Sequence, residues 1–301
     1  MVRISMGLKS GIPGEVDYSL GQLVRISFES GDELRAEGYP GLAEALFEKL
    51  GTLEALVANR HTDGAGEVLE DVEFTNQLEK INEAALVLRN MSLQMDNAQY
   101  FSRLKNGRKI VVDCMNLPNQ SSFIELKHYV LDMVEAMAIY FSLSVEDELF
   151  SSLHANLLSD DRGLLLGSLR AICRFIMGRD EANRIGEIQQ AAVDRIKNLL
   201  MLEDEDLVSA CLDFLYQYTA NEDNVEKLTQ PPEGAQLVKQ LMRLLLYQAV
   251  PGEQVVWLTK AQKLPPKNTV IPNLPQEIVN DLLSYTEPER AAKWLVSCPW
   301  Y

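Results

Sequence analysis

One 17-residue frame occurs twice in the chain without a gap, at residues 85–101 and 212–228. The first copy reads ALVLRNMSLQMDNAQYF and the second reads LDFLYQYTANEDNVEKL. Each joins an apolar helical pattern to an Asp-Asn pair and then to further apolar residues. A weaker third copy spans residues 171–185, where Asn183 follows an apolar helix and an acidic turn. A unit of this kind that recurs at intervals of roughly 40 residues predicts an all-α fold, an α-solenoid of stacked helical repeats.

The matched positions of the two copies share both size and chemistry. They are Leu88 and Leu215, Ser92 and Thr219, Asp96-Asn97 and Asp223-Asn224, and Phe101 and Leu228. We expect the apolar helix to end at the Asp-Asn pair and the side-chain oxygens of that pair to cap the next helix. The chain would then bend sharply, and the following apolar residues would return to the stack.

Residues 121–141 predict a helix that is apolar over most of its circumference. Its one polar stripe consists of Glu125, His128, Asp132 and Glu135. Such a helix has neighbours on at least two sides. Ser122 and Glu125 have the spacing of a capping box at its start. The same broad apolar pattern recurs at residues 161–178, 204–221 and 234–250.

The rest of the chain predicts one repeat domain with a C-terminal extension. Leu20, Leu23, Val24, Ser27 and Phe28 fall on one face of a helix near the start. Glycines and acidic residues at 61–75 predict a mobile loop. We therefore expect an armadillo-like repeat domain over residues 1–263, a Pro-rich connector over 264–275, and helices within 276–301 that pack on the solenoid.

The charge and the apolar pattern exclude several classes of protein. The chain has 28 basic and 44 acidic residues among 301, a net charge of -16, which is the wrong sign for affinity based on neutralising phosphates. No apolar run approaches the ~20 residues of a membrane span, and the N-terminal segment lacks the apolar centre of a signal peptide. We expect a soluble intracellular protein without a membrane partner, whose four dispersed cysteines are reduced core thiols.

Catalytic and metal-binding motifs are not found in the sequence. P-loop, GxSxG, HExxH and dinucleotide patterns are missing, and the segment DEDLVSACLDF lacks the central glycine of an EF-hand. His61, His128 and His154 are far apart, which favours solvated over catalytic histidines. We expect no enzyme, no catalytic, metal or cofactor-binding residues, and no small-molecule substrate.

The frame and several longer segments resemble a known family. LRNMS followed by DNAQYF is similar to the passage out of the third helix of an armadillo repeat. SGIPGEVDYSLGQLVRIS, LPNQSSFIELKHYVLDMVEAMAIYF and YTEPERAAKWLVSC resemble, in order, the armadillo-like domain of the Rsc-nine subunits of fungal RSC chromatin-remodelling complexes. That family is related to the ARID-bearing subunits of animal SWI/SNF complexes.

The resemblance implies a nuclear, non-enzymatic scaffold. Its partners would be other subunits of a SWI/SNF-class remodeller, including the ATPase subunit. It also implies that this chain is one domain of a longer protein, because the zinc fingers and winged-helix segment of such proteins are missing here. The alternative is an armadillo-type transport receptor for extended basic peptides, which the acidic charge favours and the lack of an asparagine ladder opposes.

Five residues are candidates for partner binding. Asn90 lies where armadillo repeats can place an asparagine facing the concave groove, where its amide would hold a peptide backbone; the alternative is a capping or solvated asparagine. The segment RLKNGRK, residues 103–109, contains Arg103, Lys105, Arg108 and Lys109. This basic turn would meet an acidic partner surface or nucleosomal phosphates, or would be a solvated loop.

Overall fold

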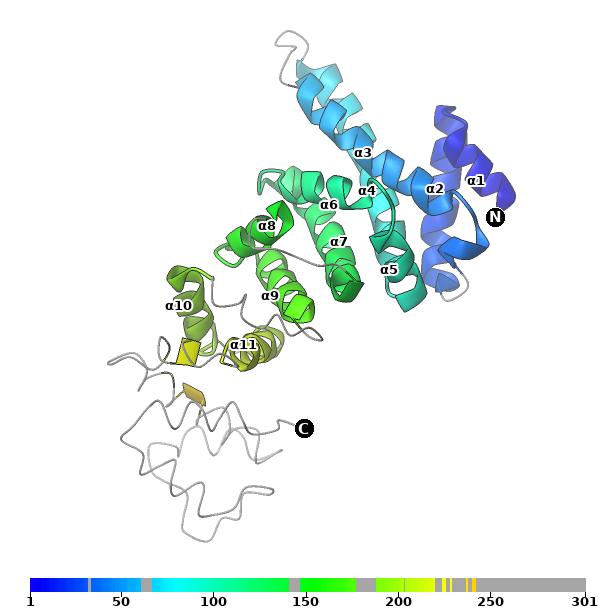
Figure 1. The fold of residues 1–301 in the computed structure, drawn as a ribbon. Helices are drawn as coiled ribbons and strands as arrows, with labels where there is room; N and C mark the ends of the chain where they lie inside the picture. Colours follow the sequence, from blue (N-terminus) through cyan, green and yellow to red (C-terminus); the bar gives the residue numbers. More distant parts are fainter. Residues whose placement is uncertain are drawn as a thin grey trace, which may run out of the picture. The chain divides into compact units, whose positions relative to one another are not determined.

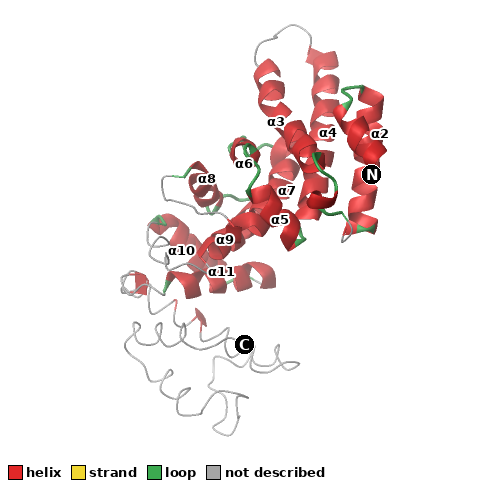
Figure 2. Ribbon diagram, turned by 45° about the vertical axis from the view of Figure 1, so that its right-hand side comes forward, coloured by secondary structure: helices red, strands yellow, loops and turns green. Residues whose placement is uncertain are grey.

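The computed structural model describes residues 1–31, 34–60, 67–140, 147–176, 188–202 and 204–219, together with Asn224, Val225, Leu228, Leu237, Gln240 and Leu241. Every secondary-structure element in these residues is a helix (Figures 1 and 2), which confirms the all-α prediction. The chain divides into two units, Met1–Gly178 and Arg179–Tyr301. The predicted single domain over 1–263 stays a prediction, and the connector 264–275 and the segment 276–301 lie outside the described residues.

The described helices of the first unit are α1 (Val2–Lys9), α2 (Pro13–Glu29), η2 (Ala36–Gly38), α3 (Leu42–Arg60), α4 (Glu67–Ser92), α5 (Met95–Ser102), α6 (Gly107–Met115), α7 (Ser121–Met137), η3 (Ala138–Tyr140), α8 (Glu148–Asn156) and α9 (Arg162–Ile176). Those of the second unit are α10 (Gln190–Leu199) and α11 (Glu205–Tyr218).

The first unit is built from two rows of helices (Figure 1). In the first row, α2 packs against α4, α4 against α7, and α7 against α9. In the second row, α3 packs against α6 and α6 against α8. A short helix, a second-row helix and a first-row helix follow one another three times along the chain, as η2-α3-α4, α5-α6-α7 and η3-α8-α9. This order is a solenoid of three-helix repeats, as the sequence predicts.

Helix α7 lies in the interior of this stack. It packs against α4 and α9 in its own row and against α6 in the other. Its apolar residues Val130, Leu131 and Val134 are at most 1% exposed. The rings of Phe74 in α4 and Phe123 in α7 meet edge to face at 6.2 Å. The prediction that this helix has neighbours on at least two sides is therefore confirmed.

Two local predictions for α4 and α7 are wrong. Helix α7 begins at Ser121, the first residue of the predicted segment, but its N-cap residue is Gln120 rather than Ser122 and makes no side-chain cap. Ser122 is thus inside the first turn, and Glu125 accepts a hydrogen bond from Tyr129 rather than closing a capping box. The predicted loop over 61–75 is helical from residue 67 onward, and residues 61–66 lie outside the described residues.

The other predicted helices are mostly present. Residues 161–178 contain α9 and residues 204–221 contain α11, whose N-cap Asp204 accepts a hydrogen bond from the Leu207 amide at 3.2 Å. Most of 234–250, and Asn183 of the third frame copy, lie outside the described residues. Of the helices that the structure describes, none combines the length and the apolar character needed to cross a membrane.

Candidate partner-binding surface

The turn between α4 and α5 is fixed by Asn97, which is 1% exposed. Its Nδ2 donates hydrogen bonds to the carbonyl oxygens of Met91 and Leu34, both at 2.9 Å, and its Oδ1 accepts from the amide of Ala36 at 2.8 Å. Met91 belongs to the last turn of α4, whereas Leu34 and Ala36 follow α2. Asn97 therefore links the end of α4 to the segment that follows α2, the neighbouring helix of the first row.

The expected direction of this capping is wrong. Helix α5 has Gln94 as its N-cap, and the side chain of Gln94 does not cap the helix. Instead of an oxygen that caps the next helix, Asn97 uses its amide nitrogen to cap the carbonyl end of the previous one. Buried carbonyl groups at a helix end need such a donor, because water cannot reach them.

The second copy of the frame makes the same bond. Asn224 is 1% exposed, and its Nδ2 donates to the carbonyl oxygen of Tyr218 at 3.0 Å, six residues back. Asn97 and Met91 are separated by the same six residues. Met91 and Tyr218 are both at most 1% exposed. The frame read from the sequence is thus a structural motif in which an asparagine ends a long buried helix.

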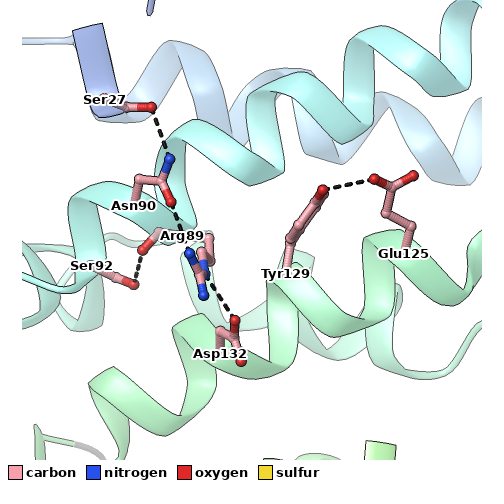
Figure 3. Close-up of polar contacts among 7 residues, drawn as sticks. All are labelled: Ser27, Arg89, Asn90, Ser92, Glu125, Tyr129 and Asp132. Atoms are coloured by element: carbon pink, nitrogen blue, oxygen red, sulfur yellow. Dashed lines mark hydrogen bonds and ion pairs between the residues drawn. The ribbon is translucent and has the colours of Figure 1, made fainter. Parts of the chain in front are cut away.

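Asn90 lies near the end of α4, with its side chain directed toward α2, and is 6% exposed (Figure 3). Its Nδ2 donates to the Ser27 hydroxyl at 3.0 Å, and its Oδ1 accepts from the Arg89 guanidinium at 3.1 Å. Both polar groups of the amide therefore bind within the protein. A peptide backbone would reach this amide only by displacing Ser27 and Arg89.

Ion pairs join successive helices of the first row. They are Asp17 with Lys80 between α2 and α4 at 2.7 Å, Arg89 with Asp132 between α4 and α7 at 2.8 Å, and Glu135 with Arg174 between α7 and α9 at 3.1 Å. We call these three pairs the ion-pair row. Figure 3 shows Arg89 reaching across from α4 to Asp132.

The ion-pair row includes two members of the polar stripe predicted on α7, Asp132 and Glu135. The other two are also bonded: His128 Nε2 lies 2.6 Å from Asp161 Oδ1, and Glu125 accepts from the Tyr129 hydroxyl at 2.7 Å. The stripe is polar as predicted, but its side chains link α7 to both neighbours as well as facing water.

Burial sets the electrostatics of this face. It raises the pKa of the Glu135 carboxyl, and the nearby Arg174 guanidinium only partly offsets that effect. Burial, together with the hydrogen bond to Glu125, raises the pKa of Tyr129 to about 12. The three ion pairs of the ion-pair row are partly exposed, so they link neighbouring helices while contributing modestly to stability.

The basic turn consists of Arg103, Lys105, Arg108 and Lys109, between α5 and the first turn of α6. Arg108 pairs with Asp147, and Lys109 pairs with Asp113 at 2.9 Å. Arg103 and Lys105 are exposed, and within the described residues neither has an ion-pair partner. Two of the four cations are thus already paired with carboxylates of the same protein.

Large apolar side chains are exposed at one end of the row helices. Phe28 at the end of α2 is 65% exposed, Leu93 and Met95 at the α4–α5 turn are 66% and 67% exposed, and Ile139 in η3 is 40% exposed. We call these four residues the apolar edge. Of the residues predicted to share one face of α2, Leu20, Leu23 and Ser27 are buried, whereas Phe28 is exposed.

Buried basic side chains, among them Lys127 and His154, were not predicted from the sequence. Lys127 is 2% exposed, and its ammonium group donates to the Leu117 carbonyl at 2.8 Å and to Asn119. Burial lowers the pKa of this lysine. His154 is 9% exposed and stacks on Phe150, so the expectation that it is solvated is wrong. Both residues lie within apolar helical segments of the sequence, and this position was the signal that could have indicated their burial.

The cysteines in the part of the chain that the structure describes are buried and poorly reactive. Cys114, Cys173 and Cys211 are free and buried, as expected, whereas Cys298 lies outside the described residues. Burial raises the pKa of Cys114 and of Cys211 to about 12, so both are neutral thiols at physiological pH. No three His, Cys, Asp or Glu side chains of the described residues are grouped to hold a metal ion.

Solved structures share this fold. A designed armadillo repeat protein matches 98% of this chain and 98% of its own length with a TM-score of 0.60 at 15% identity. Another, designed for modular peptide recognition, matches 86% of this chain and 97% of its own with a TM-score of 0.58 at 15% identity. A third, in complex with the peptide (KR)4, has a TM-score of 0.53 at 18% identity and covers 86% of this chain and 95% of its own. Together with the two rows of helices, these matches define an armadillo-repeat-like protein.

No family model matches the chain. It is, however, 32% identical over 304 residues to chromatin structure-remodeling complex subunit rsc9 of Schizosaccharomyces pombe strain 972. The chain is therefore a homologue of rsc9, in agreement with the resemblance read from the sequence. The similarity covers 99% of this chain and 38% of that protein, so the chain spans well under half the length of its relative.

Proposed function

We propose that this protein is a non-enzymatic scaffold of an ATP-dependent chromatin-remodelling complex of the SWI/SNF class, acting in the nucleus. The observation that carries the proposal is the 32% identity to rsc9 along 99% of the chain. Because the similarity is not confined to one helix or one turn, it supports a shared mode of assembly as well as a shared fold.

The described surface supports a passive role. Stacked repeats present an extended surface on which several partners dock at once. The first row is held by buried apolar residues such as Leu88 and Met91 and by the ion-pair row, which together keep the helices in register. Its partners would be other subunits of the remodeller, including the ATPase subunit.

The proposal is tested by affinity purification of the tagged chain from nuclear extract at about 150 mM salt, near physiological ionic strength, followed by mass spectrometry. We expect the ATPase and other remodeller subunits in a constant ratio. The control is Leu88→Asp, which places a charge at a fully buried position and should abolish recovery by unfolding the repeat. Recovery of import factors or diverse basic peptides in place of remodeller subunits would contradict the scaffold role.

A second candidate function is a receptor for extended basic peptides. The net charge of -16 favours it. The geometry of Asn90 opposes it, since the amide that would hold a peptide backbone already binds Ser27 and Arg89. Titration with a fluorescent Lys-Arg repeat peptide separates the two functions, because saturable binding that Asn90→Ala abolishes would favour the receptor.

We also propose that any contact with nucleosomes runs through the basic turn. Arg103 and Lys105 support this, because they are exposed and have no ion-pair partner among the described residues. Arg108 and Lys109 contribute less, since each would first have to leave an acidic partner.

A further inference from the structure

The apolar edge includes the end of α2 and the α4–α5 turn, which lie next to each other. The Ser27 hydroxyl accepts a hydrogen bond from Asn90 at 3.0 Å, which places the last turns of α2 and α4 side by side. Phe28 follows Ser27 directly, and Leu93 is within one turn of Asn90. Both side chains are about two-thirds exposed, at 65% and 66%.

Two further contacts extend the edge. Met95 is followed by Asp96, which pairs with Arg35 at 2.6 Å in the segment after α2. Helix α5, which begins at Met95, packs against η3, which contains Ile139. In Figure 1 the lower ends of α2, α5 and α7 lie along the same side of the first unit.

Four large apolar side chains gathered in this way are unusual on a water-exposed surface. Single exposed apolar residues are normal, but a group along one edge marks an interaction site. The ends of α2, α4 and α7 succeed one another at helix-packing spacings of about 8–10 Å, so the edge is about 20 Å long. A helix rises about 1.5 Å per residue, and about 14 residues with one anchor per heptad would match that length.

Charge complementarity indicates what such a helix would carry. Glu29 and Asp96 flank the edge with side chains 62% and 67% exposed, on a chain of net charge -16. Their present partners Arg25 and Arg35 are 66% and 58% exposed, and exposed ion pairs of this kind contribute little stability. Basic groups of a partner can therefore replace them. A second copy of this chain would instead bring another charge of -16.

We propose that the apolar edge is the docking site for an amphipathic helix of about four turns, with aliphatic residues on one face and lysine or arginine beside them. The proposal rests on the proposed function only in assigning that helix to another subunit of the same complex. The contact uses the ends of the row helices, whereas an extended peptide would lie along the row itself.

The test uses two synthetic peptides of about 16 residues with the same leucine face at heptad spacing, one flanked by lysine and the other by glutamate. Binding to the 301-residue chain is measured by fluorescence anisotropy. We expect the lysine peptide to saturate, the glutamate peptide to bind more weakly, and the combined variant Phe28→Ser, Leu93→Ser, Met95→Ser to lose at least tenfold in affinity. All three side chains are exposed, so this variant should keep its melting temperature.

A matched control replaces equally exposed apolar residues elsewhere. Val2 and Met6 in α1 and Val72 near the start of α4 are 75%, 69% and 54% exposed. Val72 lies 21 residues before Leu93 on the chain, a rise of about 30 Å along α4. Their combined change to serine should leave the affinity for the lysine peptide unchanged. Equal losses in both variants would mean general attraction to an acidic protein and would overturn the proposal.

Other results would also overturn it. These are tighter binding of the glutamate peptide, no saturation of either peptide, or self-association that the edge variant abolishes in sedimentation. The edge variant is also used in the nuclear-extract purification, so the two proposals can fail separately. If remodeller subunits are recovered at unchanged levels with the edge variant, the scaffold role stands and the edge proposal falls. If the lysine peptide binds the edge but remodeller subunits are never recovered, the scaffold proposal falls instead.

Discussion

At the scale of single residues, two asparagines in the same turn region have different roles. Asn97 makes three hydrogen bonds, two as donor and one as acceptor, to main-chain groups of two separate segments. Asn90 makes two hydrogen bonds, to side chains of α2 and of its own helix. The first fixes where the chain turns, and the second helps to hold α2 against α4.

The role of Asn97 predicts a large effect of its removal. Asn97→Ala leaves the Leu34 carbonyl and the Ala36 amide without this partner, whereas the Met91 carbonyl still accepts from the Gln94 amide; each unsatisfied buried group costs about 1–3 kcal/mol. We expect a loss of about 2–4 kcal/mol in the free energy of unfolding by urea. Asn106→Ala is the control, since Asn106 is exposed and makes no side-chain cap to α6, and it should change stability by less than about 0.5 kcal/mol. Equal effects of the two changes would mean that the hydrogen bonds of Asn97 do not stabilise the turn between α4 and α5.

A second residue-scale prediction concerns acid stability. Burial lowers the pKa of His154 below the value near 6.5 of an exposed histidine. As pH falls through about 6.5, the unfolded chain takes up a proton that the folded protein resists, so His154 makes the folded state less stable on the acid side. We expect the melting temperature to fall more between pH 7.5 and 5.5 for the wild type than for His154→Gln. An equal fall in the melting temperature of the two proteins would contradict a role of His154 in acid stability.

The sequence predicted where the chain turns but not which residues the buried asparagines contact. The frame predicted that the chain turns at Asn97, since helical periodicity and an Asp-Asn pair are local signals. It did not predict that Asn90 meets Ser27, because those residues are 63 positions apart and nothing in either neighbourhood encodes the pairing. Asn90 was accordingly assigned to a groove on resemblance to armadillo repeats, and the apolar edge was not predicted at all.

At the scale of helices, long apolar segments were predictable and their ends were not. Helices α7, α9 and α11 follow from broad apolar periodicity. The first turns of α4 were predicted as a loop because of the glycines and acidic residues before Phe74, yet Phe74 packs on Phe123 and the helix continues back to Glu67. Packing from a distant helix therefore outweighed the local signal.

Close approach of α7 and α9 makes a prediction about glycine. A Cβ atom at Gly167 in α9 would lie 2.7 Å from Leu131 Cδ2 and 2.8 Å from its Cγ. Alanine favours a helix by about 1 kcal/mol over glycine, but forcing the buried Leu131 aside costs about 1–3 kcal/mol. We expect Gly167→Ala to lower the melting temperature by a few degrees.

The matched control is Gly21→Ala in α2, which is exposed and has no atom within 4 Å of an added Cβ. Only the helix preference acts there, so this change should raise stability by about 0.5–1 kcal/mol. Calorimetric melting of the two variants should thus give shifts of opposite sign. A stabilising effect at both positions would mean that α7 and α9 pack less closely than the structure has them.

At the scale of the whole molecule, the distribution of charge distinguishes the acidic surface, which repels nucleic acid, from the basic turn, which can attract it. A net charge of -16 repels nucleic acid over most of the surface, and the ion-pair row uses its cations internally. Within the described residues, the basic turn is where exposed cations gather and two of them, Arg103 and Lys105, have no acidic partner. The protein alone should therefore bind DNA very weakly, and a nucleosome contact needs the rest of an assembly to hold the basic turn in place.

The last prediction follows from that dependence. In a purified assembly containing this chain, Arg103→Glu with Lys105→Glu should weaken nucleosome binding and make it less sensitive to salt. Each phosphate contact contributes about 0.9 to the slope of log affinity against log salt, so the slope should fall by about one to two. Lys109→Gln is the control, because Lys109 already pairs with Asp113 and should change the slope less. The proposed scaffold role places subunit docking on other surfaces, so the subunit composition should be the same in all three proteins. An unchanged slope in the double variant would make the basic turn a solvated loop.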